Sequence, residues 1–160
     1  HRIDLGLVEG ICRLPNLRYT TFLQDELVAV VHTGSKLSLP DEITPEDLSR
    51  IPLVLRERGS GTLDVFERAL SEHNMKLSSL NVLLYLGSTE SIKLFLEHTD
   101  CIGIVSIRSI SRELLSGTFR VIEIKGMPML REFCFAQPQG QESGLSQVLM
   151  QFAMHHNKKL

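Results

Sequence analysis

The sequence predicts an α/β fold with a mainly parallel sheet, and three observations carry this prediction. Short apolar runs alternate with segments of helical spacing along most of the 160 residues. Two of the apolar runs end in Gly/Ser/Thr turns, after which the pattern becomes helical. A hydrophobic content of 42% with 22% charged residues is typical of a soluble globular protein, and a chain of this length can bury a proper core in one domain or two small lobes.

The first half of the chain contains four strand-like segments. Residues 1–9 are strand-like from the first position, so we expect this chain to be cut from a longer one. Residues 17–23 alternate loosely, whereas 26–32 and 53–55 are apolar runs typical of buried strands. Thr44 and Pro45 predict a helix start, because a capping hydroxyl is followed by proline at the first helical position.

The second half continues the alternation. Helical spacing extends from the first Gly/Ser turn to about Asn74, and a second helix places Ile92, Phe95 and Leu96 on one face. A short helix is expected to end at Gly117. Ser143 is expected to cap a last helix that carries Leu145, Val148, Leu149 and Phe152. The remaining strand-like segments are 81–86, 100–106, 119–124 and 131–136.

The stretch 53–62 is the most informative segment, since its apolar run leads into Gly59-Ser60-Gly61-Thr62 and then into a helix. The N–H groups of a first helical turn have no intrahelical partner, and the helix dipole makes that end partly positive. Small side chains let an anion come close, and the hydroxyls of Ser60 and Thr62 can donate to it. The turn is therefore predicted to bind a small anion or to cap its helix, rather than to act in catalysis.

A second turn of the same kind follows residues 81–86. There Gly87 precedes Ser88 and Thr89, either of which can cap the next helix. Ser106 also follows a buried strand and is interpreted as a helix cap, with contact to a ligand as the alternative. Two such units can point their helix N-termini at one cleft, although capping alone explains each turn.

Composition and motifs exclude several classes of function. The net charge of −2 gives no support for direct nucleic-acid binding. There is no apolar run near 20 residues and no signal-peptide pattern, so neither a membrane span nor export is expected. Three widely spaced cysteines, Cys12, Cys101 and Cys134, indicate reduced thiols in a cytoplasmic protein.

Enzymatic, metal and cofactor functions are also not expected. His155 and His156 would point about 100° apart on a helix, so they do not chelate a metal together. Ser60 lacks the Gly-x-Ser-x-Gly frame of a nucleophile elbow, and no third glycine completes a dinucleotide fingerprint. Arg56 and Glu57 are expected either to form a local ion pair or to line the cleft.

Five segments have the order and spacing of a known family: residues 4–10 (DLGLVEG), 25–31 (DELVAVV), 52–62 (PLVLRERGSGT), 86–90 (LGSTE) and 102–106 (IGIVS). Together they resemble the effector-binding domain of LysR-type transcriptional regulators, over essentially the whole chain. The resemblance implies a periplasmic-binding-protein-like (type 2) fold. Two Rossmann-like lobes would be joined by crossing strands near 28–32 and 131–135, with a small effector in the cleft between them.

The resemblance also implies a domain organisation. Residues 1–30 and 129–160 would form an incomplete lobe one and 31–128 lobe two, and the winged helix-turn-helix that binds DNA is absent from this chain. The implied molecule is a cytoplasmic homodimer or higher homo-oligomer that senses a small anionic metabolite. It would contact DNA only through the missing domain, and no membrane. A transport-type solute-binding protein and a small phosphate-binding α/β enzyme, with Glu57 as its base, are the alternatives.

The effector-binding residues that follow from the turns and the resemblance lie in both predicted lobes. Arg131, near the return crossing, is a candidate cation, although a solvated arginine at a strand edge is the alternative. Arg58 stands where the family commonly has proline, and Leu63 where it commonly has arginine, which removes a cation from the ligand's surroundings. The full set is Gly59, Ser60, Gly61, Thr62, Ser88, Thr89, Ser106 and Arg131.

Overall fold

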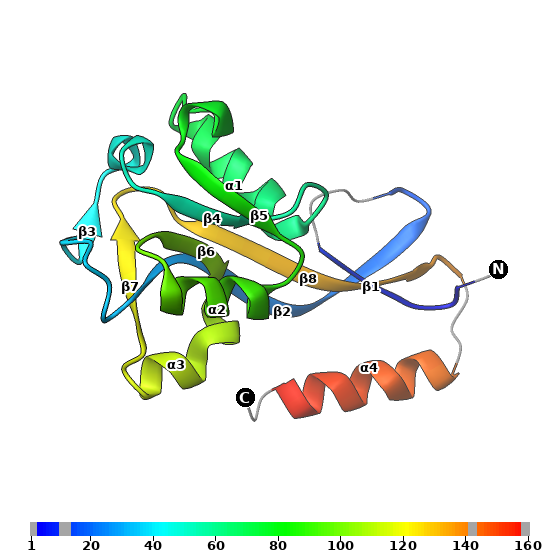
Figure 1. Cartoon of the computed structure of the whole chain (residues 1–160). Helices are drawn as coiled ribbons and strands as arrows, with labels where there is room; N and C mark the ends of the chain where they lie inside the picture. Colours follow the sequence, from blue (N-terminus) through cyan, green and yellow to red (C-terminus); the bar gives the residue numbers. More distant parts are fainter. Residues whose placement is uncertain (1–2, 10–13, 141–143, 158–160) are drawn as a thin grey trace. The chain divides into compact units, whose positions relative to one another are not determined.

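The computed structural model describes residues 3–9, 14–140 and 144–157. The chain divides into two compact units: His1–Asp25 with Arg131–Leu160, which we call unit 1, and Glu26–Leu130, which we call unit 2. The chain enters unit 2 within strand β2 (Leu17–His32) and leaves it within strand β8 (Met129–Pro138). Figure 1 labels the elements of both units.

Unit 1 contains β1 (Gly6–Glu9), parts of β2 and β8, and α4 (Gly144–Asn157). β1 pairs antiparallel with β8, so that Gly6 lies opposite Ala136, and β8 in turn neighbours β2. The expected cap of α4, Ser143, lies outside the described residues. The apolar face predicted for this helix is exposed, with 53–80% of each side chain accessible at Leu145, Val148, Leu149 and Phe152.

The sheet of unit 2 is mainly parallel, as the sequence predicted, with β2 (Leu17–His32) running in the opposite direction. Its order is β7 (Phe119–Ile124), β2, β6 (Ile102–Ser106), β4 (Leu53–Arg56) and β5 (Val82–Leu86), with β3 (Glu42–Ile43) beside β7. β4 runs parallel to both β5 and β6, but β2 is antiparallel to β6 and β7. β4, β5, β6 and β7 follow one another through helical connections, which strands of the same direction require, whereas β2 leads into a loop and β3.

Helices cover both faces of the sheet in unit 2. α1 (Gly61–Glu72) lies on one face, and α2 (Thr89–His98) and α3 (Ser111–Leu115) lie on the other (Figure 1). Successive residues of β4 point to opposite faces, so Leu53 and Leu55 pack in the core that contains Phe66 of α1, and Val54 packs with Ile92 of α2. Burial on both faces explains why β4 is an uninterrupted apolar run.

Short 3₁₀ turns complete unit 2: Pro45–Ser49, Leu77–Ser79 and Ile107–Ile110. The predicted start at Thr44 is confirmed, and its backbone N–H and hydroxyl both donate to the Asp47 carboxylate at 2.9 Å. Gly117 ends α3 with φ +73°, a conformation that favours glycine. Among the described residues, no helix is long and apolar enough to cross a membrane.

The two cysteines that the structure describes, Cys101 and Cys134, are buried free thiols. Burial raises the pKa of Cys101 to about 11, and the neighbouring Asp100 carboxylate adds to this rise. At neutral pH this thiol is therefore protonated and behaves as a small apolar side chain of the core.

Candidate functional site

The candidate site lies at one edge of the sheet in unit 2, where three parallel strands end. Because β4, β5 and β6 run in the same direction, their carboxyl ends meet at this edge. Each strand leads within a few residues into a helical segment, and the residue that caps each segment is a serine: Ser60, Ser88 and Ser106. The three turns that the sequence singled out therefore belong to one edge of one sheet.

The strand order of the sheet reverses between β4 and β6. The connection after β4 leads through α1, on one face, to β5, whereas the connection after β6 leads through α3, on the opposite face, towards β7. Ligands of open α/β sheets bind at such points, because the two connections diverge and leave a crevice outside the strand ends. The Glu57 N–H, after β4, donates to the Leu86 carbonyl of β5 at 3.1 Å, so the turns after β4 and β5 are held together at their base.

Arg56 joins these two turns through its side chain. Its guanidinium donates two hydrogen bonds to the Glu57 carboxylate, both at 2.9 Å, and a longer one to the Gly87 carbonyl at 3.3 Å. The hydrogen bond from Arg56 holds the pKa of Glu57 below its ordinary value. The local ion pair, one of the two expectations for these residues, is present, and Arg56 also bridges to the second turn.

The first turn has the geometry expected of a cap. Gly59 adopts φ +86°, and a Cβ there would meet nothing within 4 Å, so the backbone conformation rather than space favours glycine. Ser60 caps α1, because its hydroxyl oxygen accepts a hydrogen bond from the Leu63 N–H at 3.2 Å. Gly61 is the first residue of the helix, and Thr62 is only 8% exposed. A capping oxygen that accepts from the backbone still has its proton to donate, so capping and ligand contact are compatible at Ser60.

The second and third turns are also capped. Ser88 accepts from the Ser91 N–H at 3.1 Å and shares a second hydrogen bond with the Ser91 hydroxyl at 2.8 Å. Thr89 is the first residue of α2. Ser106 accepts from the Arg108 N–H at 3.2 Å. The capping interpretation of Ser106 is therefore confirmed, and capping also describes Ser88.

A hollow of about 460 Å³ opens beside the first turn. Its lining includes Gly59 and two cationic side chains, Arg58 and Lys76, together with the carboxylates of Asp64 and Glu67. The cations provide charge complementary to an anion near the first turn of α1, while the carboxylates reduce the net positive charge.

Arg131 lies in unit 1 and is not part of this edge. Its guanidinium donates to the Asp25 carboxylate at 2.7 and 2.8 Å, and it lies 3.7 Å from a Glu9 carboxylate oxygen. It also lies over the Phe133 ring, 4.9 Å from the centroid. The side chain is only 12% exposed, so it is not the solvated arginine that was the alternative. Any contact between Arg131 and an effector stays a prediction.

The part of the chain that the structure describes contains no cluster of metal-binding side chains. No group of three or more His, Cys, Asp or Glu side chains is placed to hold an ion there. His156 instead interacts through its Nδ1 with the Phe152 carbonyl at 2.9 Å, which fixes it on its own helix.

Comparison with known proteins identifies the family. The model of the LysR substrate binding domain matches residues 1–158. The chain belongs to the LysR substrate-binding domain family. This family assignment and the α/β architecture agree with the fold that the resemblance implied.

Two relatives of this LysR substrate-binding domain are transcriptional regulators by name. The uncharacterized HTH-type transcriptional regulator YeiE of Escherichia coli (strain K12) is 33% identical over 123 residues, which are 77% of this chain and 41% of YeiE. The HTH-type transcriptional activator CmpR of Synechocystis sp. is 29% identical over 144 residues, 89% of this chain and 46% of CmpR. The chain thus spans less than half the length of these relatives.

A solved structure shows the same fold. The Synechocystis PCC6803 CcmR regulatory domain in complex with 2-PG superposes with a TM-score of 0.80 at 25% identity, over 98% of this chain and 74% of that one. This LysR substrate-binding domain therefore shares its fold with the regulatory domain of CcmR, a structure determined with a small ligand bound.

Proposed function

We propose that this LysR substrate-binding domain senses a small anionic metabolite and thereby modulates DNA binding and transcription by the full-length regulator. The observation that carries the proposal is the convergence of three serine-capped turns at one sheet edge in unit 2. Two of these turns open helices of ten residues or more, whose N-terminal N–H groups and dipoles favour negative charge. The complex of CcmR with 2-PG supports a small ligand for a domain of this fold.

The proposed contacts are the backbone N–H groups of Gly59 and Gly61 and the hydroxyls of Ser60 and Thr62. Ser88, Thr89 and Ser106 extend this set from the neighbouring turns, and Arg131 is the candidate in unit 1. Regulation would follow by a shift of populations, since a ligand biases the regulator only by binding one conformation more tightly than another. In this role the serines bind and do not catalyse.

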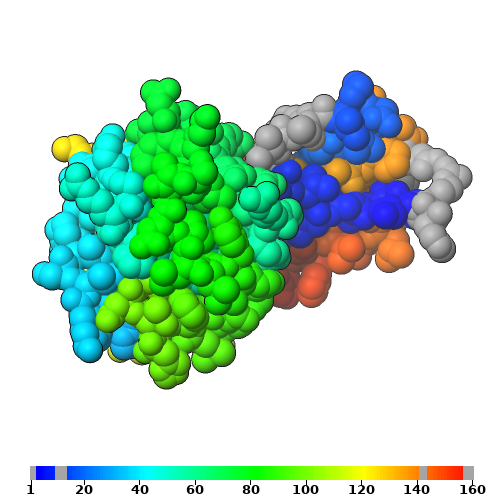
Figure 2. Space-filling model, turned by 45° about the horizontal axis from the view of Figure 1, so that its top comes forward, coloured from blue at the N-terminus to red at the C-terminus, as the bar shows by residue number. Residues whose placement is uncertain are grey.

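The proposal extends to assembly and location. We propose a homodimer or higher homo-oligomer, in the cytoplasm, that contacts DNA through a domain outside this chain. β5 is the last strand of the sheet path in unit 2, and 39–45% of each side chain is exposed at Leu83, Leu84 and Tyr85. The green atoms of the β5 and α2 segments reach the surface of unit 2 in Figure 2. An exposed apolar edge strand favours pairing with a second copy, because its backbone groups on one side lack a strand partner.

Thermal unfolding in the presence of candidate ligands tests the sensor. The panel consists of sulfate, phosphate, acetylserine-like compounds, sugar phosphates and 2-PG, each at increasing concentration. A compound present at 100 times its Kd should stabilise the native chain by about 2.7 kcal/mol, which is visible as a raised midpoint. We expect at least one anionic compound to produce this shift.

Variants then separate ligand contact from capping. The double variant Ser60→Ala, Thr62→Ala should lose about 1 kcal/mol of stability through the cap and should also lose the ligand-induced shift. Thr44→Ala is the matched control, because it removes a hydroxyl at a helix start that is outside the candidate site. Its stability should fall while the ligand-induced shift stays. A full shift in the double variant would show that the ligand binds elsewhere.

A further inference from the structure

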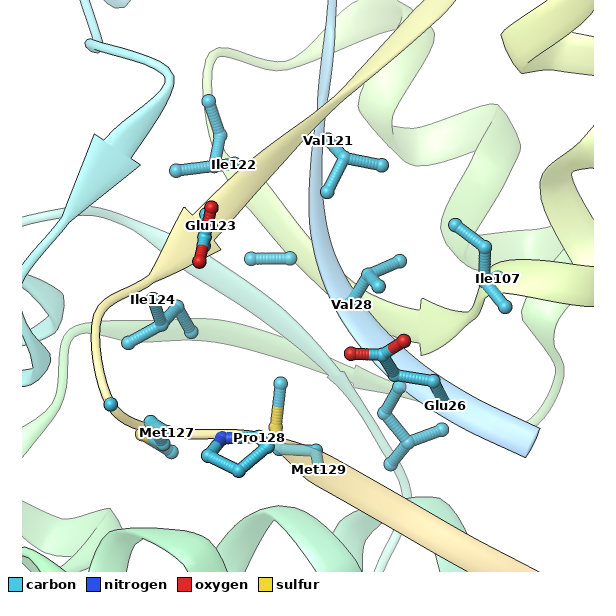
Figure 3. Close-up of a pocket in the computed structure, with 13 residues that line it drawn as sticks. Glu26, Val28, Ile107, Val121, Ile122, Glu123, Ile124, Met127, Pro128 and Met129 are labelled. Carbon is cyan, nitrogen blue, oxygen red and sulfur yellow. The ribbon is translucent and has the colours of Figure 1, made fainter. Parts of the chain in front are cut away.

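A pocket of about 530 Å³ in unit 2 adjoins the third capped turn at Ile107, but none of the capping serines lines it. Its volume is in the range of small-molecule sites. The pocket is bounded by β2, by the end of β7 and by the turn that leads from β7 to β8, and Figure 3 shows the residues that line it.

The separation of two strands explains why the pocket exists. β7 pairs with β2 as far as Ile122, which lies opposite Ala29. The next residues of β7, Glu123 and Ile124, pair with β3 instead. β7 therefore turns away from β2, and the chain passes through Met127 before it enters β8. Figure 3 shows Glu26 and Val28 on the β2 side of the resulting opening and Glu123 and Ile124 on the β7 side.

Most of the lining is apolar. Val28 and Val121 come from the two diverging strands, and Ile107 comes from the turn after β6. Met127 and Met129 line the pocket from the connection to β8. Methionine side chains are flexible and polarizable, so they adapt to the shape of an apolar ligand.

The charged side chains in the lining are both acidic. Glu26 and Glu123 line the pocket, and no Lys, Arg or His does. Within the described part of the chain, neither carboxylate makes a side-chain hydrogen bond or an ion pair, and Lys125, the residue two positions after Glu123, makes no ion pair. The acidic groups of Glu57, Glu113 and Asp25, by contrast, all have an arginine or lysine partner. Two uncompensated carboxylates beside apolar walls create a negative potential that attracts cations and repels anions.

We propose that this pocket binds a small organic ammonium ion. The carbon skeleton packs against Val28, Ile107 and Val121 and against the two methionines, and the ammonium group lies beside Glu26 or Glu123. Because the two carboxylates stand on different strands, a diamine can use both. The pocket borders the proposed effector contacts at Ser106, but its lining selects the opposite charge, so the inference does not depend on an anionic effector.

Isothermal titration calorimetry on the full chain tests this, with 1,5-diaminopentane as the probe. Pentylamine, 1,5-pentanediol and glutarate serve as ligands of matched length with one positive charge, no charge and negative charge. We expect saturable binding of the diamine, weaker binding of pentylamine, and none of the diol or of glutarate. If 1,5-pentanediol bound as tightly as the diamine, the pocket would be an apolar cavity without selectivity for charge, which would contradict the proposal. Binding of glutarate would also contradict it.

Matched variants assign the site. Glu26→Gln with Glu123→Gln keeps the side-chain shape and removes both charges, and the affinity for the diamine should fall about tenfold. Glu46→Gln with Glu97→Gln removes two carboxylates that do not line the pocket and should leave the affinity unchanged. An equal loss in both double variants would show a nonspecific effect of net charge and would contradict the proposal. The response to anionic ligands should be the same in both, which separates this site from the proposed effector site.

Nuclear magnetic resonance of the native chain provides a readout that needs no variant. The methyl signals of Met127 and Met129 should shift as 1,5-diaminopentane is added, whereas those of Met75, Met150 and Met154, which do not line the pocket, should not. Shifts confined to the latter three would place the amine elsewhere. A response only to a lysine-containing peptide, and not to free amines, would mean that the pocket receives a protein partner, and would overturn the proposal for a small ligand.

Discussion

At the residue scale, two groups of charged side chains in this domain differ in their surroundings. Arg56, Lys93 and Arg131 each hold at least one carboxylate close by, at 2.7–2.9 Å. Glu26 and Glu123 instead line a pocket without a cation. The first group fixes local geometry, because removing one partner of a partly buried pair would leave the other charge without compensation. The second group remains available to a ligand.

The ion pair between Lys93 and Glu113 gives a prediction at this scale. Lys93 is 12% exposed, and its Nζ donates to a Glu113 carboxylate oxygen at 2.7 Å. This hydrogen bond lowers the pKa of Glu113 from its ordinary 4.5. A lowered folded-state pKa contributes stability that is present above the unfolded-state value and is lost as the pH falls through the folded-state value. Glu113→Gln should therefore reduce the free energy of unfolding by about 1 kcal/mol at pH 7.

Urea denaturation at pH 7 and near pH 3 measures this effect. The difference between Glu113→Gln and the native chain should shrink at the lower pH, because a smaller fraction of Glu113 is ionised in the native chain there. Glu97→Gln, on the exposed face of α2, should match the native chain at both values. An equal difference at both pH values would show that packing, not charge, stabilises this pair.

At the scale of elements, close packing of α2 on β6 depends on a glycine. A Cβ at Gly103 would lie 3.0 Å from the Ile92 Cγ2 and 3.1 Å from the Leu96 Cδ1. Gly103 also pairs with strands on both sides, opposite Val30 and Val54, so β6 has little freedom to move away. The Gly103→Ala substitution should therefore cost about 1–3 kcal/mol through overpacking.

Thermal and urea unfolding of Gly103→Ala test this packing. Gly87→Ala is the control, since a Cβ there would meet nothing within 4 Å and its φ lies outside the left-handed region. Adding Leu96→Ala to Gly103→Ala should relieve the clash between the new Cβ and the Leu96 side chain. The loss of this buried leucine should nevertheless lower the free energy of unfolding by more than the relief restores. If the Gly103→Ala variant were as stable as the native chain, α2 would be able to shift on the sheet without loss of stability.

At the scale of the whole molecule, the proposed assembly rests on the exposed edge at β5. Leu84 is 42% exposed in the middle of this strand. A lysine there should disfavour edge-to-edge pairing, because a charge at the edge must be desolvated when a second strand is added. Sedimentation velocity should show dimers of the native chain at micromolar concentration and a larger monomer fraction for Leu84→Lys. Leu115→Lys, at an exposed leucine of α3, should leave the assembly unchanged.

The elements of this domain were largely predictable from sequence, because they depend on local patterns. Apolar runs such as Leu53–Arg56 predict strands, and Gly59, Ser60 and Ser88 predict the turns and caps that follow them. The mainly parallel sheet of unit 2 was predicted correctly, but the reversed direction of β2 was not, since strand order and direction depend on long-range pairing. That β2 lies antiparallel to β6 cannot be seen in either segment alone.

The sequence by itself determined the α/β class, the capped Gly/Ser turns and, through the order of five segments, the resemblance to the LysR family. Each of these depends on neighbours in the chain, where backbone geometry and capping chemistry act over a few residues. Tertiary structure alone decided that Ser60, Ser88 and Ser106 share one edge, that Arg56 bridges two turns, and that Glu26 and Glu123 line a common pocket. Glu26 and Glu123 are nearly a hundred positions apart in the sequence, and only the divergence of β7 from β2 brings them to the same opening.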